Sequence, residues 1–194
     1  MIAIDTEYIP ETASEDVIPS QRPDVTKVYC EIIQIGAVRL NEEGKETEAL
    51  NITVSPSFIF SLPKWLKDMT GMTDEKRQQG ISFKDAIQKL NDFIGEDKNI
   101  WTFNGDWFVF IKNAEKHNVE LPFSKFKRVL PKLQEWGVTL EGFQNIGSKE
   151  VCSGDLYKVL GIKLPNIEGV GTHDATHDAR SLAHSVYFLE KKHG

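Results

Sequence analysis

The stretch Gly171-Thr172-His173-Asp174-Ala175-Thr176-His177-Asp178-Ala179-Arg180 lies where a glycine-containing loop gives way to the last apolar helical repeat of the chain. It repeats His-Asp-Ala at a spacing of four residues. A helix start accounts for one Asp or Thr, because these side chains cap helices and acids suit the positive end of the helix dipole. Capping does not account for two His-Asp pairs. The stretch therefore predicts the final helix together with a functional site.

A pair of acids lies in the first segment of the chain. Met1 to Thr6 is apolar and β-branched, which predicts a short strand that runs into Asp5-Thr6-Glu7. Because side chains alternate along a strand, Asp5 and Glu7 fall on the same face, with carboxylates roughly 6 to 7 Å apart. The pair can share a metal ion or mark a solvent-facing strand edge. Its position at the end of an apolar strand favours a site.

A third acid, Asp106, follows the strand predicted over Asn99 to Phe103. It stands where that strand hands over to a helix predicted over Phe108 to His117. Open α/β sheets bind their ligands at this carboxyl end of their strands. Asp106 is also suited to cap the helix, and the two roles are compatible.

The other periodicities predict an α/β sheet whose first three strands meander and whose later strands are entered through helices. The turn between the second and third strands is expected at Asn41 to Gly44, and a glycine-centred turn at Met69 to Thr73. The remaining predicted elements are strands over Glu31–Leu40, Thr47–Val54 and, weakly, Phe126–Leu130; helices over Pro63–Asp68, Ser82–Ile94 and Val151–Leu160; and a long loop over residues 9–29.

Length and composition are those of one globular domain spanning residues 1–194, with 40% hydrophobic and 27% charged residues. Apolar runs fall short of the ~20 residues that span a bilayer, so no membrane is expected as a partner. Met1 to Pro10 has acids where a signal peptide would be apolar, and we expect a cytoplasmic protein. Cys30 and Cys152 have no ligand-like spacing and are expected to be small core residues.

The net charge of −6 argues against a protein that coats nucleic acid through bulk electrostatics. It does not exclude an enzyme that meets phosphate through metal ions held by carboxylates. The basic residues Lys125, Lys127, Arg128 and Lys132 form either a solvated face or, less favoured, a phosphate track.

The carboxylates of Asp5, Glu7, Asp106 and Asp178 are hard oxygen ligands, which suit Mg²⁺ or Mn²⁺ better than Zn²⁺. Two such ions ~3.5 to 4 Å apart would clamp a phosphodiester and stabilise its attacking and leaving oxygens. A histidine that approaches Asp178 is the natural base to deprotonate water.

The order of these motifs along the chain resembles that of a known family. Asp-x-Glu at 5 to 7, then Asp106, then His173 five residues before Asp178 resembles the DEDDh 3′ to 5′ exonucleases of the DnaQ-like, ribonuclease-H-like superfamily, over nearly the whole chain. The segments Glu31-Ile32-Ile33-Gln34-Ile35-Gly36, Thr70-Gly71-Met72-Thr73 and Gly105-Asp106-Trp107 are similar to those of the branch that trims RNA 3′ ends, including histone-mRNA and small-RNA enzymes.

The resemblance implies a five-stranded mixed sheet flanked by helices on both sides, and release of mononucleotides from single-stranded 3′ ends, of RNA more than DNA. It implies that Asp5, Glu7, Asp106 and Asp178 hold two divalent cations, Mg²⁺ or Mn²⁺, and that His173 is the general base. Protein partners are left open. The residues that it places beside the terminal nucleotide are Thr6, Tyr8, Thr70, Gly71, Met72 and Trp107, although Trp107 equally suits a buried structural role.

Two other interpretations remain. His173 and His177 have the spacing of a zinc pair, which would leave Asp5, Glu7 and Asp106 without a role. A non-catalytic nucleic-acid-binding or scaffolding protein on the same fold is the second, and the complete set of presumed catalytic residues argues against it. Within the opening stretch, His173 is expected on a loop whose position depends on substrate, with Asp174 and His177 as bystanders.

Overall fold

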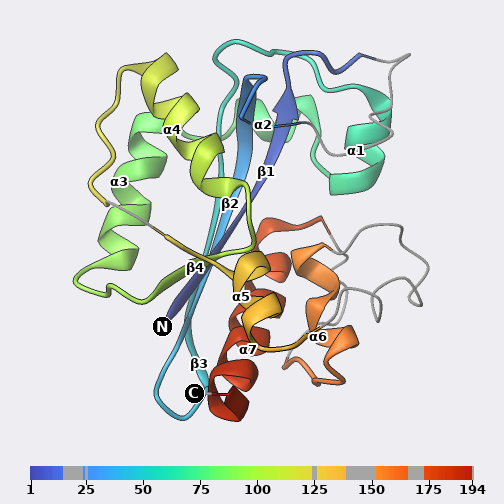
Figure 1. Cartoon of the computed structure of the whole chain (residues 1–194). Helices are drawn as coiled ribbons and strands as arrows, with labels where there is room; N and C mark the ends of the chain where they lie inside the picture. Colours follow the sequence, from blue (N-terminus) through green and yellow to red (C-terminus); the bar gives the residue numbers. More distant parts are fainter. Residues whose placement is uncertain (15–23, 25, 124–125, 139–151, 166–172, 194) are drawn as a thin grey trace.

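A five-stranded mixed sheet, in the order β3-β2-β1-β4-β5, forms the centre of the computed structural model (Figure 1). Strands β1, β2 and β3 pair antiparallel, and β4 and β5 continue the sheet parallel to β1. The model describes residues 1–14, 24, 26–123, 126–138, 152–165 and 173–193. The strands are β1 (Ile2–Pro10), β2 (Cys30–Leu40), β3 (Glu46–Thr53), β4 (Ile100–Thr102) and β5 (Lys127–Arg128).

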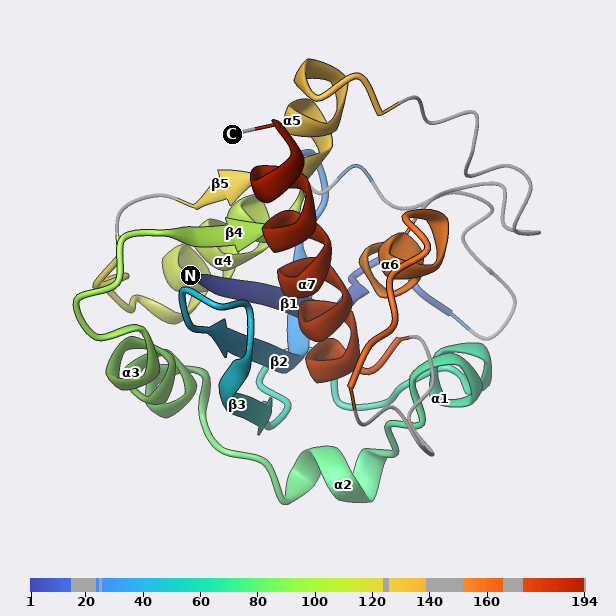
Figure 2. The same ribbon diagram turned by 90° about the horizontal axis from the view of Figure 1, so that it is seen from below.

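Helices cover both faces of the sheet, as Figures 1 and 2 show from two directions. Strands β1 and β2 are buried along almost their whole length, because both of their faces are covered. The predicted fold, a five-stranded mixed sheet with helices on both sides, is confirmed. The α-helices are α1 (Lys64–Thr70), α2 (Asp74–Gln78), α3 (Phe83–Ile94), α4 (Asp106–His117), α5 (Val129–Glu135), α6 (Leu156–Val159) and α7 (Ala175–His193).

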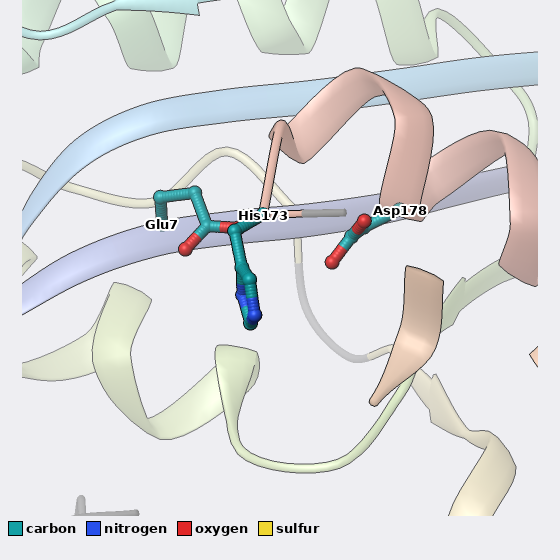
Figure 3. A group of neighbouring side chains, drawn as sticks. All are labelled: Glu7, His173 and Asp178. Atoms are coloured by element: carbon teal, nitrogen blue, oxygen red, sulfur yellow. The ribbon is translucent and has the colours of Figure 1, made fainter. Parts of the chain in front are cut away.

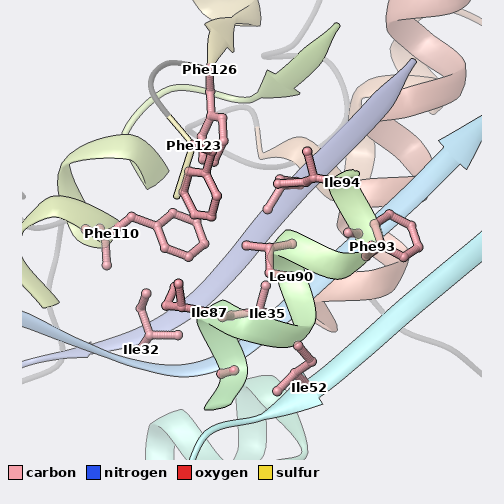
Figure 4. Close-up of a cluster of buried hydrophobic side chains, with 14 of the residues drawn as sticks. Ile32, Ile35, Ile52, Ile87, Leu90, Phe93, Ile94, Phe110, Phe123 and Phe126 are labelled. Atoms are coloured by element: carbon pink, nitrogen blue, oxygen red, sulfur yellow. The ribbon is translucent and has the colours of Figure 1, made fainter. Parts of the chain in front are cut away.

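Alternation along β1 divides the core into two parts. Ile2 and Ile4 face the cluster made with α3 and α4, where the rings of Phe110, Phe123 and Phe126 pack together (Figure 4). Ala3 faces the opposite cluster, made with α5, α6 and α7. Asp5 and Glu7 continue the odd-numbered side of β1, so the pattern directs these acids toward α7.

Helix α7 lies directly on β2 because Gly36 has no side chain. A Cβ placed at Gly36 would come within 2.1 Å of the Ala175 carbonyl carbon, closer than side chains approach in proteins. Gln34 fixes the same junction: its amide oxygen accepts from the Ala175 N–H at 3.2 Å, and its Nε2 donates to Asp174 Oδ2 at 3.2 Å. The start of α7 is thereby held over the middle of the sheet.

Several predicted elements change in the structure. Strand β1 extends to Pro10, so the predicted loop begins later than residue 9, and residues 15–23 and 25 of that loop lie outside the described residues. The predicted strand over Phe126 to Leu130 is wrong beyond Arg128, because helix α5 begins at Val129. Helix α4 begins at Asp106 with Gly105 as its N-cap, so Asp106 is not the cap.

The predicted helix over Val151 to Leu160 is two short pieces, the 3₁₀ helix η2 (Ser153–Asp155) and α6, and Val151 lies outside the described residues. Helix α2 was not predicted from the sequence. Both cysteines are buried and neither forms a disulfide, as expected. Among the described residues, no helix is long and apolar enough to cross a membrane.

Candidate active site

Three predicted site residues from distant parts of the chain meet at one point. Glu7 from β1, His173 before α7 and Asp178 in the first turns of α7 each place one potential metal-ligating atom within 4.8 Å of the others. Figure 3 shows the three side chains around a common space, with the His173 ring between the two acids. Glu7 and Asp178 are buried and His173 is half-buried. The five-residue interval from His173 to Asp178 includes the first turn of α7, which begins at Ala175 and brings the two side chains together.

Asp5 lies deeper in the same cluster. Its side chain is buried, and burial is the largest cause that raises the pKa of its carboxyl well above the usual range. The carboxylates of Asp106, Asp178 and Glu7 add to this increase, in that order. Four carboxylates close enough to perturb one another are electrostatically costly unless cations lie among them. Their oxygen donors and mutual proximity fit divalent metal ions.

Asp106 reaches the cluster from the other side of β1. Its Oδ1 accepts two hydrogen bonds from Thr6, one from the backbone N–H at 3.1 Å and one from the hydroxyl at 2.8 Å. Thr6, which stands between Asp5 and Glu7 in the sequence, is buried, and its two hydrogen bonds hold the Asp106 carboxylate in place. The sequence placed Thr6 only beside the substrate, and its contact with Asp106 is an additional finding.

The backbone around His173 explains its orientation. His173 adopts a left-handed conformation with φ of 69°, which is uncommon for residues other than glycine. Asp174 then caps α7: its Oδ1 accepts from the N–H groups of Thr176 at 3.1 Å and His177 at 3.0 Å. Asp174 is thus not a bystander to the fold, since it starts the helix that carries Asp178. Gly171 and Thr172 lie outside the described residues.

His177 packs against Tyr157 and the Cys152–Asp155 turn. Its side chain is buried, it lies beside the backbone of Gly154, and its ring meets that of Tyr157 edge-on with centroids 6.0 Å apart. Burial is the main cause that lowers the pKa of His177. In the described part of the chain His177 does not join the metal-competent group that contains His173. The arrangement does not favour the zinc-pair interpretation.

Ser153 is a residue of this site that the sequence analysis missed. It is buried, and its hydroxyl donates to Asp5 Oδ1 at 2.7 Å and lies 3.4 Å from Asp178 Oδ2. Because 148 positions separate it from Asp5, no local pattern could have revealed the contact. The only sequence signal is a Ser-Gly-Asp turn ahead of a short apolar helix.

The residues predicted beside the terminal nucleotide lie in different settings. Gly71 ends α1 in a left-handed conformation with φ of 66°, and the Thr70 hydroxyl accepts from the Met72 N–H at 3.2 Å. Met72 is buried, in a cluster with residues of β1, β2 and α1. Trp107 is half-buried against Phe126, with ring centroids 5.2 Å apart, and Tyr8 packs partly buried on the α4 side of the sheet. Their roles toward substrate stay predictions.

The fold is that of a ribonuclease-H-like domain, with a cluster of acids beside its central strand. A family model described as exonuclease, RNase_T, matches residues 2–185. The chain belongs to this exonuclease family, and the predicted membership is confirmed. A search of curated protein sequences finds no match.

Solved structures with the same fold are distant in sequence. The nuclease domain of 3′hExo, a DEDDh family member bound to rAMP, is 16% identical with a TM-score of 0.74, covering 99% of this chain and 92% of that one. A 3′-exonuclease that recognises the histone mRNA stem-loop is 14% identical with a TM-score of 0.75, covering 99% and 81%. A full-length 3′-exonuclease is 15% identical with a TM-score of 0.74, covering 98% of this chain, which spans 60% of that one.

Proposed function

We propose that residues 1–194 form one metal-dependent 3′ to 5′ exonuclease domain that releases nucleoside monophosphates from single-stranded 3′ ends, of RNA in preference to DNA. One observation supports this most: β1, the start of α4, the residue before α7 and α7 itself bring four carboxylates and a histidine to one place. Membership of an exonuclease family supports the same conclusion.

In this proposal Asp5, Glu7, Asp106 and Asp178 hold two divalent cations, Mg²⁺ or Mn²⁺. Bound there, the cations supply the positive charge that stabilises the attacking and leaving oxygens of a phosphodiester. The chain contributes fixed carboxylates: Thr6 holds Asp106, and α7 holds Asp178 near Glu7. Because the carboxylates are preformed, little reorganisation is needed when substrate arrives.

His173 accepts the proton of the attacking water. Imidazole is the side chain suited to this exchange near neutral pH, and His173 lies within reach of the space between Glu7 and Asp178. It is half-buried, so water can approach it while the acids behind it remain shielded. Among the described residues, His177 is not part of the group that Glu7, His173 and Asp178 form, so this proposal does not give it that role.

RNA is the preferred substrate in this proposal because the similar segments belong to enzymes that trim RNA, and because two similar structures carry rAMP or recognise a histone mRNA stem-loop. Thr70, Gly71 and Met72 then line the pocket for the terminal nucleotide. In the same proposal Tyr8 and Trp107 contact the substrate.

The test is digestion of one sequence made as single-stranded RNA and as DNA, labelled at the 5′ or the 3′ end, with Mg²⁺ or Mn²⁺. We expect stepwise shortening of the 5′-labelled strand, immediate release of labelled mononucleotide from the 3′-labelled strand, and faster cleavage of RNA. Cleavage of neither nucleic acid by pure protein would contradict the exonuclease proposal. Faster cleavage of DNA would contradict only the RNA preference.

Replacing His173 tests the base. His173→Ala is expected to lower kcat by about 10²- to 10⁴-fold, the usual contribution of general-base catalysis. His193→Ala removes an exposed histidine at the far end of α7 and is the matched control, with activity like that of the wild type. If both variants retain full activity, His173 is not the base.

A further inference from the structure

A short turn, Cys152–Asp155, packs against the cluster of carboxylates. It contains none of the five predicted catalytic residues. Its contact with Asp178 is very close: a Cβ at Gly154 would come 2.2 Å from Asp178 Oδ1 and 3.0 Å from Asp178 Oδ2. Only a glycine leaves room for the carboxylate at this position. The turn is therefore shaped to the acid that it faces.

The turn also supplies a hydrogen bond to the cluster. The Ser153 hydroxyl donates to Asp5 Oδ1 at 2.7 Å, and its oxygen lies 3.4 Å from Asp178 Oδ2. A hydroxyl has one proton to donate, so the shorter contact, to Asp5, is the stronger bond. Ser153 thus stands between a ligand from the first strand and a ligand from the last helix.

Helix α7 holds the turn in place on its other side. The Ser181 hydroxyl donates to the Ser153 carbonyl at 2.5 Å and accepts from the Tyr157 N–H at 3.3 Å. One helical turn earlier, the buried side chain of His177 lies beside the backbone of Gly154, which acts on its pKa. All of Ser153, Ser181 and His177 are buried, so these bonds are shielded from water.

We infer that Ser153 is a positioning residue: the turn Cys152–Asp155 fixes the Asp5 and Asp178 carboxylates in the orientation that binds the divalent cations. This inference rests on the proposed function. Hydrogen bonds to ligating carboxylates orient them, and loss of such a bond typically lowers metal affinity or activity by about 10- to 100-fold. It also gives His177 a role, because its buried side chain lies beside Gly154 of the turn and not in the group of Glu7, His173 and Asp178.

The test compares Ser153→Ala with Ser185→Ala. Ser185 is a second fully buried serine on α7, and its hydroxyl has no partner in the described part of the chain, so its removal leaves the site intact. The Mn²⁺ affinity of metal-free protein is measured by electron paramagnetic resonance of free Mn²⁺, and kcat and KM on a single-stranded RNA. We expect Ser153→Ala to bind Mn²⁺ about 10- to 100-fold more weakly and to lose kcat with KM unchanged, while Ser185→Ala matches the wild type.

A second variant keeps the inference testable if Ser153→Ala does not fold. Ser181→Ala leaves the Ser153 hydroxyl in place but releases the turn backbone, and should weaken Mn²⁺ binding by less than Ser153→Ala does. Ser153→Thr keeps the hydroxyl and should recover most of the affinity.

Mn²⁺ affinity of the folded Ser153 and Ser181 variants equal to that of Ser185→Ala overturns the inference, even if their melting temperatures fall. A wild-type protein that binds Mn²⁺ and cleaves RNA alongside that result leaves the proposed function standing. A wild type that does neither overturns both.

Discussion

Two buried acidic sites lie on neighbouring strands, and they are balanced in different ways. Glu31 on β2 has its cation within the chain: the Arg77 guanidinium lies 2.9 Å from its carboxylate, and both side chains are buried. Asp5 on β1 is also buried, but the charges that act on it most are three other carboxylates. A buried charge requires compensation. The contrast teaches that the first site is complete as folded and the second is built for a cation that binds.

Backbone hydrogen bonds also distinguish the Glu31 site from the Asp5 site. Glu31 accepts the N–H groups of Ser57 at 2.8 Å, Phe58 at 3.0 Å and Ile59 at 2.8 Å, and Arg77 donates to the Ile59 carbonyl. Glu31 therefore ties β2 to the loop before α1 and, through Arg77, to α2. Such a site supports the fold, whereas burial and the neighbouring carboxylates make the charge of Asp5 costly in the absence of a cation.

The largest effect is expected from a substitution at Asp5. Asp5→Asn removes a proposed metal ligand and one of four clustered charges but keeps the shape and an acceptor for Ser153. Loss of several kcal/mol of transition-state stabilisation lowers kcat/KM on the order of 10³-fold or more. Stability without metal should be unchanged or higher, because repulsion is relieved. Single-turnover cleavage and thermal unfolding in EDTA measure both; a fall in metal-free stability would argue that Asp5 is structural.

The second prediction concerns the Glu31 site. A substitution there should lower the stability of the protein, the opposite of what is expected for Asp5→Asn. Arg77→Met leaves Glu31 buried without its cation and should lower the free energy of unfolding by about 3 to 5 kcal/mol. The double variant Glu31→Gln with Arg77→Met removes both charges and should recover much of that loss. Urea unfolding measures the two variants. Equal stability of the single and double variants would show that the ion pair is not what holds this region.

The sequence predicted which acids come together in the structure but not the residues that support them. Asp5, Glu7 and Asp106 were recognisable because each follows an apolar strand pattern, and Asp178 because it lies in a doubled His-Asp pair at the start of a helix. Ser153 was not, because a serine in a turn has many ordinary roles and its partner Asp5 lies 148 positions away. Long-range contacts of this kind follow from the fold, which local patterns do not encode.

The same reasoning explains which elements were missed. Helix α2, of sequence Asp-Glu-Lys-Arg-Gln, has no apolar periodicity, and it is held by the Thr73 cap and by Arg77 buried against Glu31. Helix α5 begins at Val129, where apolar and β-branched residues favour a strand, but packing of Val129 and Leu133 against the α7 side of the core decides otherwise. Regular amphipathic helices such as α3, with its Ser82 cap, were predicted closely.

The third prediction concerns the effect of added Mn²⁺ on stability. Mn²⁺ that binds the folded but not the unfolded chain raises the free energy of unfolding by about 2.7 kcal/mol when its concentration is 100 times the dissociation constant. The wild type and Arg77→Met should both gain this stability, because the Glu31 site is separate from the metal site. Asp5→Asn should gain little. Differential scanning calorimetry with Mn²⁺ and with EDTA makes the comparison, and an equal gain in all three proteins would place the metal elsewhere.

The smallest expected effect is in the pH dependence of metal-free stability. The folded-state pKa of Asp5 is raised, chiefly by burial, so the folded protein binds its proton more tightly than the unfolded chain does. Its stabilising contribution is therefore fully present below the unfolded pKa, about 3.9, and is lost as pH rises through the raised folded value. Asp5→Asn lacks this dependence.

Three histidines, of which His177 is buried and His117 and His184 are half-buried, act in the opposite direction over part of the pH range. Burial lowers the pKa values of His117, His177 and His184, so their contributions are present above about 6.5 and are lost as pH falls through the lowered values. Subtracting the urea-unfolding profile of Asp5→Asn from that of the wild type, both in EDTA, cancels these histidine terms. The difference should show the wild type losing stability relative to Asp5→Asn as pH rises from 4 toward neutrality, and Mn²⁺ should offset the loss at neutral pH. If the difference in the free energy of unfolding did not change with pH, the acids around Asp5 would not repel one another. The electrostatic contrast between the Asp5 and Glu31 sites would then be wrong.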